Sequence, residues 1–409
     1  MRDILTFILA GGRGERLHPL TRDRAKPAVP FGGHYRIIDF ALSSCVHSDL
    51  RRIFILTQYK SLSLEEHIRD GWTVLSPALD EFLQTIPPQQ RTRTDWYLGT
   101  ADAIHQNWYC VDRFAMEHGS PSAILILAGD HVYKMDYRAM MDFHREKDAD
   151  VTVAVLRLHH DEVRAKLGAL VVDEDSRAVA FEEKPLRPTG MPGSPDHCLA
   201  SLGIYAFRPE VLRDELDRDA GDDASNHDFG RNLLPAMIGR RRVYAFPFEL
   251  GNRNTGVYWR DVGTIDSYWE AHMDLVGVVP RFDLHDRSWP IHTVNRPRPP
   301  AKIVRGEGDV PGAAFDSLVS SGAIISGGTV VRSVLSPGVV VQSGAHVEES
   351  VLLDRVTIGR GARIRRTIID KRVSVPPGAT IGYDRAADEK AYTVTESGIT
   401  VVPKDPFVQ

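Results

Sequence analysis

The chain of 409 residues has little cysteine and no long hydrophobic run. Its three cysteines, Cys45, Cys110 and Cys198, lie far apart and form no metal-ligand spacing, which favours reduced thiols in a cytoplasmic protein. No apolar run approaches ~18 residues, so the sequence predicts no membrane span. The N-terminal apolar run is short and carries Asp3 where a signal peptide would be basic, so we expect no export.

A strong charge of one sign is also missing. The formal net charge is −5 at pH 7, which gives no basis for binding nucleic acid or an acidic membrane surface. Hydrophobic residues make up 42% of the sequence, an ordinary share for a protein with a buried core. A chain of this length is expected to form two or three domains.

Residues 1–277 alternate short apolar runs with amphipathic segments. This alternation predicts an α/β domain around a mostly parallel sheet. In such sheets ligands bind beyond the carboxyl ends of the strands. The sequence predicts strands at 4–9, 53–56, 123–127 and 151–156, and a helix at 102–114.

The first predicted strand ends in a run with three glycines within residues 11–14. Glycine lets peptide N–H groups approach a ligand closely, and a nest of such groups binds anions. Arg13, Arg16 and Lys26 add positive charge nearby, and the combination suits a triphosphate. The spacing is neither Gly-x-Gly-x-x-Gly nor the P-loop pattern, and a glycine-rich turn alone would more often be structural.

The whole string around this loop decides between these interpretations. Leu-Ala-Gly-Gly-x-Gly-x-Arg-Leu from Leu9, followed by Lys26-Pro27, resembles the signature of sugar-1-phosphate nucleotidylyltransferases. The run Arg-Ala-Lys-Pro-Ala-Val-Pro-Phe-Gly-Gly-x-Tyr-Arg-Ile-Ile-Asp-Phe from Arg24 resembles one branch, the glucose-1-phosphate adenylyltransferases. The resemblance extends from Ile8 to about Val402. It implies a Rossmann-like nucleotidyltransferase domain followed by a left-handed parallel β-helix.

The activity implied by this resemblance is transfer of the adenylyl group of ATP to glucose 1-phosphate, which gives ADP-glucose and pyrophosphate for glycogen synthesis. The sugar phosphate would attack the α-phosphorus in line, without a covalent intermediate, so catalysis would be positioning and charge neutralisation. Arg16 would hold the leaving pyrophosphate, and Lys26 would stabilise the triphosphate. By the same resemblance the nucleotide-binding residues are Leu9, Ala10, Gly11, Gly12, Gly14, Gln58, Gln89 and Gly99.

Asp130 follows a buried strand directly, in Ala128-Gly129-Asp130-His131. Mg²⁺ is held by one or two carboxylates plus substrate phosphates, so a carboxylate beside a phosphate loop suits this ion. Taken alone, such an aspartate would more often cap a helix. The resemblance makes Asp130 a catalytic metal ligand, supplies Asp261 as the second ligand and makes Mg²⁺ the expected cofactor.

The run Phe181-Glu182-Glu183-Lys184-Pro185 resembles the sugar-phosphate motif of the family. Lys184 would bind the phosphate of glucose 1-phosphate as a mobile point charge, and Glu183 would accept hydrogen bonds from sugar hydroxyls. Without the resemblance, a solvated charge run before a proline would be the better interpretation. For Trp96, core packing and substrate contact are equal alternatives. The implied sugar pocket further contains Tyr97, Gly168, Ser201, Tyr205 and Asp228.

Residues 278–312 are rich in proline and predict a stiff connection, and residues 313–409 predict a β-helix domain. A repeat of seventeen residues, with aliphatic positions about every six residues and glycine turns, is typical of a parallel β-helix. Each coil would bury its aliphatic side chains on the next coil. The repeating sets include Val334, Val351 and Ile368; Ile324, Val341, Ile358 and Val375; and Val330, Val347, Ile364 and Ile381.

Assembly and regulation are the expected roles of this second domain. The resemblance implies a homotetramer controlled by anionic metabolites, with Arg24, Arg36 and Arg113 as candidate effector-binding residues between the domains. Family members often carry a basic residue just before the Arg-Ala-Lys-Pro run, but this chain has Asp23 there. The identity of the activator is therefore left open.

Three alternative functions are weighed against this interpretation. A related enzyme that uses UTP or TTP is disfavoured by the strings around Arg36 and Trp259. A catalytically silent regulatory subunit would be expected to lack one of the charged site residues, and all are present. A β-helix acyltransferase would leave the first 277 residues unexplained, and His346 lies inside a coil rather than at a coil junction.

Overall fold

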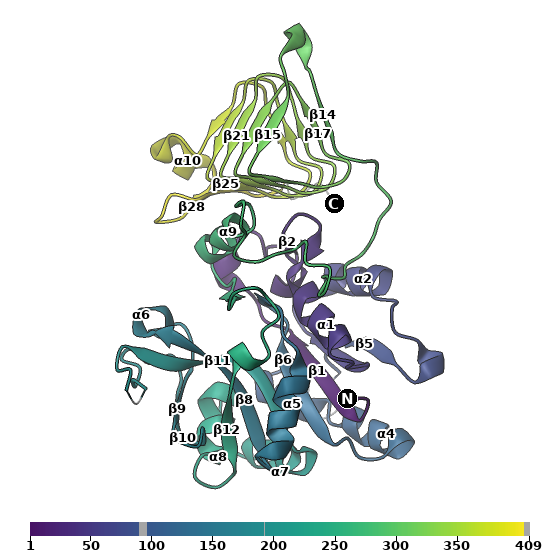
Figure 1. Cartoon of the computed structure of the whole chain (residues 1–409), viewed down its shortest axis with the longest axis vertical. Coiled ribbons are helices and arrows are strands. Elements are labelled where there is room, and N and C mark those ends of the chain that lie inside the picture. Colours follow the sequence, from purple (N-terminus) through teal and green to yellow (C-terminus); the bar gives the residue numbers. More distant parts are fainter. Residues whose placement is uncertain (90–95, 192, 405–409) are drawn as a thin grey trace.

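The computed structural model describes residues 1–89, 96–191 and 193–404. An α/β domain and a β-helix are joined by an irregular connection, and the β-helix sits on one end of the α/β domain (Figure 1). The helices are α1 (Ile37–His47), α2 (Leu62–Gly71), α3 (Thr100–Gln106), α4 (Tyr109–His118), α5 (Tyr137–Glu146), α6 (His160–Val163), α7 (Pro209–Ala220), α8 (Leu234–Met237), α9 (Ile265–Met273) and α10 (Arg385–Ala391).

A nine-stranded sheet forms the centre of the α/β domain. Strands β6, β1, β4 and β5 lie side by side and run parallel, which confirms the predicted parallel core. On the other side of β6, the sheet continues through antiparallel pairs made by β11. Its strands are β1 (Ile4–Ala10), β4 (Arg52–Thr57), β5 (Phe82–Ile86), β6 (Ala123–Ala128), β8 (Val151–His159), β9 (Ala169–Val172), β10 (Ala178–Glu182), β11 (His197–Phe207) and β12 (Val243–Pro247).

The four strands predicted from apolar runs correspond to β1, β4, β6 and β8. The single helix predicted over 102–114 is wrong, because two short helices, α3 and α4, replace it. The break falls at Asn107 and Trp108, where the Asn107 side chain donates back to the Ala103 carbonyl. Periodicity of apolar residues alone does not reveal a turn that a side-chain amide stabilises.

Two small antiparallel pairs hold the segments that carry charged residues near the main sheet. In the first, β7 (His131–Tyr133) pairs with β13 (Trp259–Asp261), and Asp261 lies opposite His131. In the second, β2 (Pro30–Phe31) pairs with β3 (Tyr35–Arg36). The first pair brings two segments that are far apart in sequence to the carboxyl end of β6.

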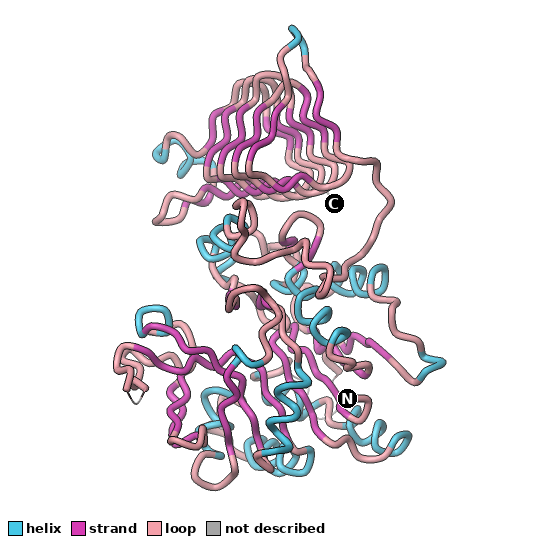
Figure 2. The backbone as a smooth tube through the Cα atoms, viewed as in Figure 1, coloured by secondary structure: helices cyan, strands magenta, loops and turns pink. Residues whose placement is uncertain are grey.

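The C-terminal domain is a left-handed parallel β-helix with three sheets (Figure 2). The aliphatic residues of one coil stack on those of the next, as predicted: Val330 pairs with Val347, and Val347 with Ile364. The strands are β14 (Lys302–Val304), β15 (Ala313–Phe315), β16 (Leu318–Val319), β17 (Ile324–Ser326), β18 (Thr329–Val331), β19 (Val334–Leu335), β20 (Val340–Val341), β21 (His346–Glu348), β22 (Val351–Leu352), β23 (Thr357–Ile358), β24 (Arg363–Arg365), β25 (Thr367–Ile369), β26 (Ser374–Val375), β27 (Thr380–Ile381), β28 (Thr393–Val394) and β29 (Thr400–Val402).

Two details of the predicted repeat are wrong. Ile325 rather than Ile324 pairs with Val341, because the turn between Ile325 and Gly327 is one residue shorter than its counterpart between Val341 and Gly344. The β-helix also begins before residue 313, since β14 at Lys302–Val304 already pairs with β17. The connection therefore ends near residue 301.

The two domains share one hydrophobic core. Leu17, Phe31 and Ile265 of the α/β domain belong to the same buried cluster as Val351 and Val401 of the β-helix. In addition, the Trp269 indole N–H donates to the Glu349 carbonyl oxygen at 2.7 Å. This contact area fixes the relative position of the two domains.

The connection is held along one face of α1. Three side chains of α1, spaced four residues apart, contact it. Asp39 accepts from the Thr293 hydroxyl, and Ser43 accepts from the His292 backbone N–H. His47 contacts the Pro290 carbonyl oxygen through Nε2. These contacts attach residues 290–293 of the connection to the α/β domain. Among the residues described, no helix is both long and apolar enough to cross a membrane.

Candidate active site

The glycine-rich loop lines a large cavity at the carboxyl end of β1. The cavity has a volume of about 1100 Å³. Gly14 adopts a left-handed conformation with φ of 63°, which favours glycine, and a Cβ on Gly12 would meet no atom within 4 Å. The Gly12 backbone therefore borders open space, so a ligand can approach its peptide groups closely.

Most residues predicted to bind nucleotide, and several with other predicted roles, line this cavity. Of the residues predicted to bind nucleotide, only Gln89 is not among the lining residues. Its neighbours Gln90 and Arg91 lie outside the described residues. The predicted residues that line the cavity are Leu9, Ala10, Gly11, Gly12, Gly14, Arg16, Lys26, Gln58, Tyr97, Gly99, Asp130 and Asp228.

Lys26 lies between the two predicted metal ligands. Its Nζ is 2.9 Å from an oxygen of Asp130 and 2.8 Å from an oxygen of Asp261. Asp130 extends from the loop after β6, and Asp261 ends β13, so the β7–β13 pairing brings the two carboxylates together. Arg16 adds a more distant contact, with Nη2 3.8 Å from Asp261.

The electrostatics of this group follow from its burial and its opposite charges. Burial opposes the charged form of Asp130, but Lys26 and His131 outweigh this effect and lower the pKa of Asp130 to about 2. The two carboxylates reciprocally raise the pKa of the buried Lys26 ammonium. Asp130 and Lys26 are therefore both charged at neutral pH.

Asp130, His131 and Asp261 form a potential cation site, because one ligand atom of each lies within 4.8 Å of the others. The two carboxylates offer the oxygen ligands that Mg²⁺ prefers. His131 fits less well, since a metal-bound histidine normally donates its second N–H to an acceptor, and Nδ1 of His131 is buried with no partner among the described residues. The donor set therefore fits a cation held by the two aspartates.

The residues predicted to bind the sugar form a second group beside the first. A Cβ on Gly168 would lie 3.2 Å from a Glu183 oxygen, and the Ser201 backbone N–H donates to the Gly168 carbonyl at 2.8 Å. Lys184 Nζ lies 3.5 Å from Glu183. Burial raises the pKa of Tyr205, as do the nearby charges of Asp228 and Glu183. The predicted residues thus come together from β9, β10 and β11 and their loops.

Asp228 links this group to the large cavity. Thr100 Oγ1 donates to one oxygen of Asp228 at 3.0 Å, and the Gly230 and Arg231 N–H groups donate to the other. Thr100 begins α3 and lines the cavity, as Asp228 does, whereas Gly168, Glu183, Lys184, Ser201 and Tyr205 are not among the lining residues.

Tyr97 and Trp96 also line the large cavity. The side chain of Gln58 donates to the Tyr97 carbonyl at 3.3 Å. Trp96 is 59% exposed, and its ring centroid lies 5.7 Å from that of Tyr59. Trp96 is therefore not part of the hydrophobic core, which removes one of the two alternatives for this residue.

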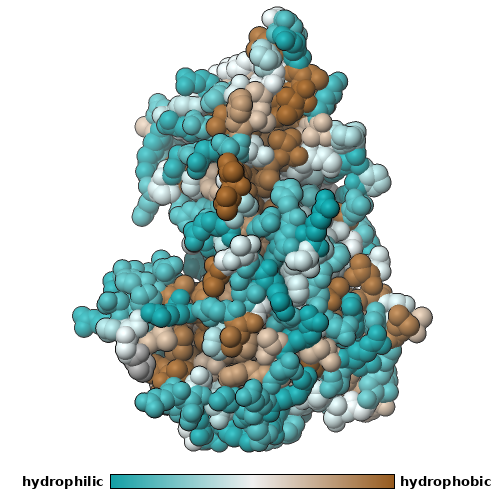
Figure 3. All heavy atoms as spheres, in the orientation of Figure 1, coloured by the Kyte–Doolittle hydropathy of each residue, from teal (hydrophilic) through white to brown (hydrophobic). Residues whose placement is uncertain are grey.

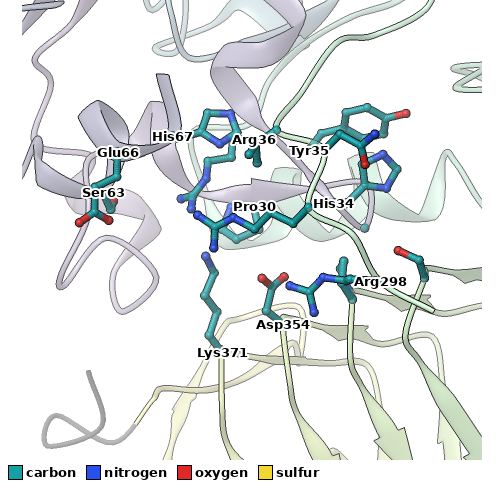
Figure 4. A pocket seen from close by; sticks show the side chains of 16 residues that line it. Pro30, His34, Tyr35, Arg36, Ser63, Glu66, His67, Arg298, Asp354 and Lys371 are labelled. Carbon is teal, nitrogen blue, oxygen red and sulfur yellow. The ribbon is translucent and has the colours of Figure 1, made fainter. Parts of the chain in front are cut away.

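A smaller cavity of about 210 Å³ lies between the domains (Figure 4). Lys371 and Asp354 extend into it from the β-helix, and Arg36 and His67 border it from the α/β domain. Burial and the neighbouring charges of Arg36 and Arg24 lower the pKa of Lys371 to about 7. The residues that line the cavity thus include more basic side chains than carboxylates.

The three candidate effector residues have different environments. Arg36 lines the inter-domain cavity. Arg24 forms a buried ion pair with Asp370 of the β-helix, with Nη2 2.9 Å from the carboxylate. Arg113 is exposed on α4, at the end of the α/β domain far from the β-helix (Figure 1), so the prediction that it lies between the domains is wrong.

Several residues at these sites were missed by sequence reasoning. Lys404 lies 3.3 Å from Asp23 and supplies a positive charge beside the position where the family often has one. Arg298 and Lys371 line the inter-domain cavity. Asn107 contacts Tyr97, and the sequence analysis placed it inside the predicted helix at 102–114 without a role. Arg298 belongs to the connection and Lys371 to the β-helix, and no sequence motif marks either residue.

Comparison with known proteins agrees with this geometry. Residues 5–277 match the family described as nucleotidyl transferase, and residues 299–402 match the GlmU-like C-terminal hexapeptide family. The glucose-1-phosphate adenylyltransferase of Rhodopirellula baltica is 51% identical, over 100% of this chain and 91% of the relative. That of Koribacter versatilis is 50% identical, over 99% and 96%. With its nucleotide loop, aspartate pair and β-helix, the chain belongs to the glucose-1-phosphate adenylyltransferase family of nucleotidyltransferases.

Proposed function

We propose that the chain transfers the adenylyl group of ATP to glucose 1-phosphate and so produces ADP-glucose for glycogen synthesis. The observation that carries this proposal is that the glycine loop, Lys26 and Asp130 line one cavity large enough for a nucleotide, where Lys26 also contacts Asp261. The names of relatives that match the full length of the chain support the same reaction.

In this proposal the α-phosphorus is attacked in line, and the chain supplies positioning and charge rather than a nucleophile. The peptide groups of residues 11–14 and Arg16 bind the leaving pyrophosphate. Lys26 neutralises charge on the triphosphate, and Lys184 binds the attacking phosphate. Glu183 and Asp228 orient the sugar through its hydroxyl groups.

Asp130 and Asp261 would hold Mg²⁺, which supplies charge neutralisation at the phosphates when bound. Their fit to the ion rests on two carboxylates whose oxygens contact one ammonium group at 2.9 and 2.8 Å. Lys26 balances their charge in the structure, and together with His131 it outweighs the effect of burial and lowers the pKa of Asp130.

The inter-domain cavity is the proposed site for an anionic effector. Arg36, Arg298 and Lys371 converge on it from the α/β domain, the connection and the β-helix. The segment that carries Lys26 also contacts the β-helix two residues earlier, through Arg24 and Asp370. An effector bound here would therefore act on the same segment that holds the catalytic lysine.

We also propose a homotetramer that buries apolar surface of the β-helix. Hydrophobic atoms gather on this domain in Figure 3. Ile303 and Phe315 are 48% and 58% exposed, on strands that begin their sheets and are covered by no further coil. Light scattering on the purified chain measures the assembly, and a monomer at micromolar concentration would contradict it.

Pyrophosphate release with glucose 1-phosphate and Mg²⁺ tests the reaction, with ATP, UTP, TTP, CTP and GTP offered separately. The assay is repeated with fructose 6-phosphate, fructose 1,6-bisphosphate, pyruvate and AMP. We expect pyrophosphate release with ATP and with none of the other four nucleotides. Release with another nucleotide would contradict the adenylyl assignment, and silence with all five would favour a regulatory subunit.

A further inference from the structure

Tyr97 borders the proposed substrate site, and the structure fixes the polarity of its hydroxyl group. The buried Asn107, which is 1% exposed, donates from Nδ2 to the Tyr97 hydroxyl oxygen at 2.8 Å. The same Nδ2 donates to the Ala103 carbonyl oxygen at 2.8 Å. A carbonyl can only accept, so this second bond fixes the amide with its NH₂ group toward both partners.

The direction of this hydrogen bond determines what Tyr97 can do. Because its oxygen accepts from Asn107, its own proton points elsewhere. No acceptor for that proton is found within the described part of the chain. Burial raises the pKa of the Tyr97 phenol above its usual value, so the group keeps its proton at neutral pH. Tyr97 lines the cavity, and its hydroxyl group retains a proton to donate.

The surrounding segment is held rigidly by the same helix. The Leu98 backbone N–H donates to Asp102 at 2.8 Å, and the Gln106 side chain donates to the same oxygen at 2.7 Å. Gln58 donates to the Tyr97 carbonyl from the opposite side. Tyr97 is thus restrained at its carbonyl and hydroxyl groups, and its neighbour Leu98 at its N–H, which reduces the entropy lost when a ligand binds.

We propose that Asn107 is a positioning residue that makes Tyr97 a hydrogen-bond donor to a phosphate oxygen of the bound substrate. The acceptor is assigned as phosphate because Tyr97 shares its cavity with the glycine loop and with Arg13, Arg16 and Lys26. The inference rests on the proposed function, in which both ATP and glucose 1-phosphate supply phosphate oxygens.

The test reverses the polarity of the contact with Tyr97, and it also replaces the donor to the Ala103 carbonyl oxygen by an acceptor. In Asn107→Asp, the carboxylate accepts the Tyr97 proton and withdraws it from the substrate. Loss of a hydrogen bond to a charged group corresponds to about a 10-fold or larger weakening. We expect the KM of one substrate to rise by about this factor, and Tyr97→Phe to raise the KM of the same substrate.

The double variant separates positioning from a structural role. If Asn107 acts through the hydroxyl group of Tyr97, Asn107→Asp in the Tyr97→Phe background should change that KM by less than about twofold. Asn107→Ala is the second comparison: it removes both hydrogen bonds but leaves the phenol free to donate, so its effect should be smaller than that of Asn107→Asp. A structural role, which includes repulsion between the new carboxylate and the Ala103 carbonyl oxygen, predicts equal losses with and without the Tyr97 hydroxyl group.

Calorimetric binding of ATP with Mg²⁺, and separately of glucose 1-phosphate, distinguishes the two phosphate sources and needs no turnover. A raised Kd for one ligand in both Asn107→Asp and Tyr97→Phe supports the inference and identifies the source. Unchanged Kd values in folded variants, or equal losses with and without the Tyr97 hydroxyl, overturn it. Absence of wild-type turnover with intact ligand binding would instead contradict the proposed function alone.

Discussion

The buried ion pair between Arg24 and Asp370 gives a quantitative prediction about the domain interface. Arg24 Nη2 lies 2.9 Å from both carboxylate oxygens, and the two side chains are only 5% and 3% exposed. Removal of one partner from such a pair leaves an uncompensated buried charge and costs ~3–5 kcal/mol. We expect Arg24→Met and Asp370→Leu each to lower the free energy of unfolding by about this amount.

The double variant Arg24→Met with Asp370→Leu should be less destabilised than the sum of the two single variants. Replacement of both charges by apolar groups removes the desolvation cost together with the attraction. Denaturant unfolding followed by tryptophan fluorescence measures these free energies, taken from the first transition because the chain has two domains. The six tryptophans include Trp269, which lies at the interface.

The exposed pair between Arg360 and Glu307 is the matched control. These side chains are 59% and 67% exposed, so Arg360→Ala should change stability by no more than ~1 kcal/mol. The reasoning would be refuted if the single variants at Arg24 and Asp370 lowered the free energy of unfolding by less than ~1 kcal/mol. It would also be refuted if the loss in the double variant equalled the sum of the two single losses.

Three further predictions concern the two cavities. Asp130→Asn should lower turnover by ~10²–10³-fold or more while the chain still folds and assembles, as measured by pyrophosphate release and light scattering; near-normal turnover would contradict the metal assignment. Gly12→Ala should raise the KM for ATP with little change in unfolding temperature, because a Cβ at residue 12 meets no protein atom within 4 Å. Gly382→Ala is the contrasting variant and should destabilise the chain, because its Cβ would lie 1.7 Å from the Arg365 carbonyl oxygen. Binding of fructose 1,6-bisphosphate in the inter-domain cavity should weaken as pH rises from 7 to 9, because the pKa of Lys371 is lowered to about 7 and an anion favours its charged form. Titration calorimetry measures this trend, and an unchanged pH dependence in Lys371→Met would contradict it.

The sequence predicted the parts of the molecule that local patterns determine. Apolar runs located the central strands, and the repeat of seventeen residues located the β-helix, because each pattern reflects side chains that share one buried face. The shift from Ile324 to Ile325 escaped this reasoning, since a one-residue deletion in a turn leaves the spacing of the later coils intact.

The arrangement of the site depended more strongly on contacts between distant segments. The approach of Asp130 and Asp261 depends on the pairing of β7 with β13, which no local pattern encodes; only the family resemblance suggested it. The break at Asn107 and the position of Arg113 likewise depend on the packing of α3 and α4. Local propensity favours a helix there but does not fix where it ends.

The core shared by the two domains affects how the chain folds during synthesis. Leu17 and Phe31 are made early, yet Ile399 and Val401 belong to the same buried cluster. A nascent α/β domain therefore exposes this apolar face to solvent until the last coil of the β-helix has left the ribosome. Chaperone binding during translation should accordingly persist until residues near 402 emerge, and should end when the face is covered.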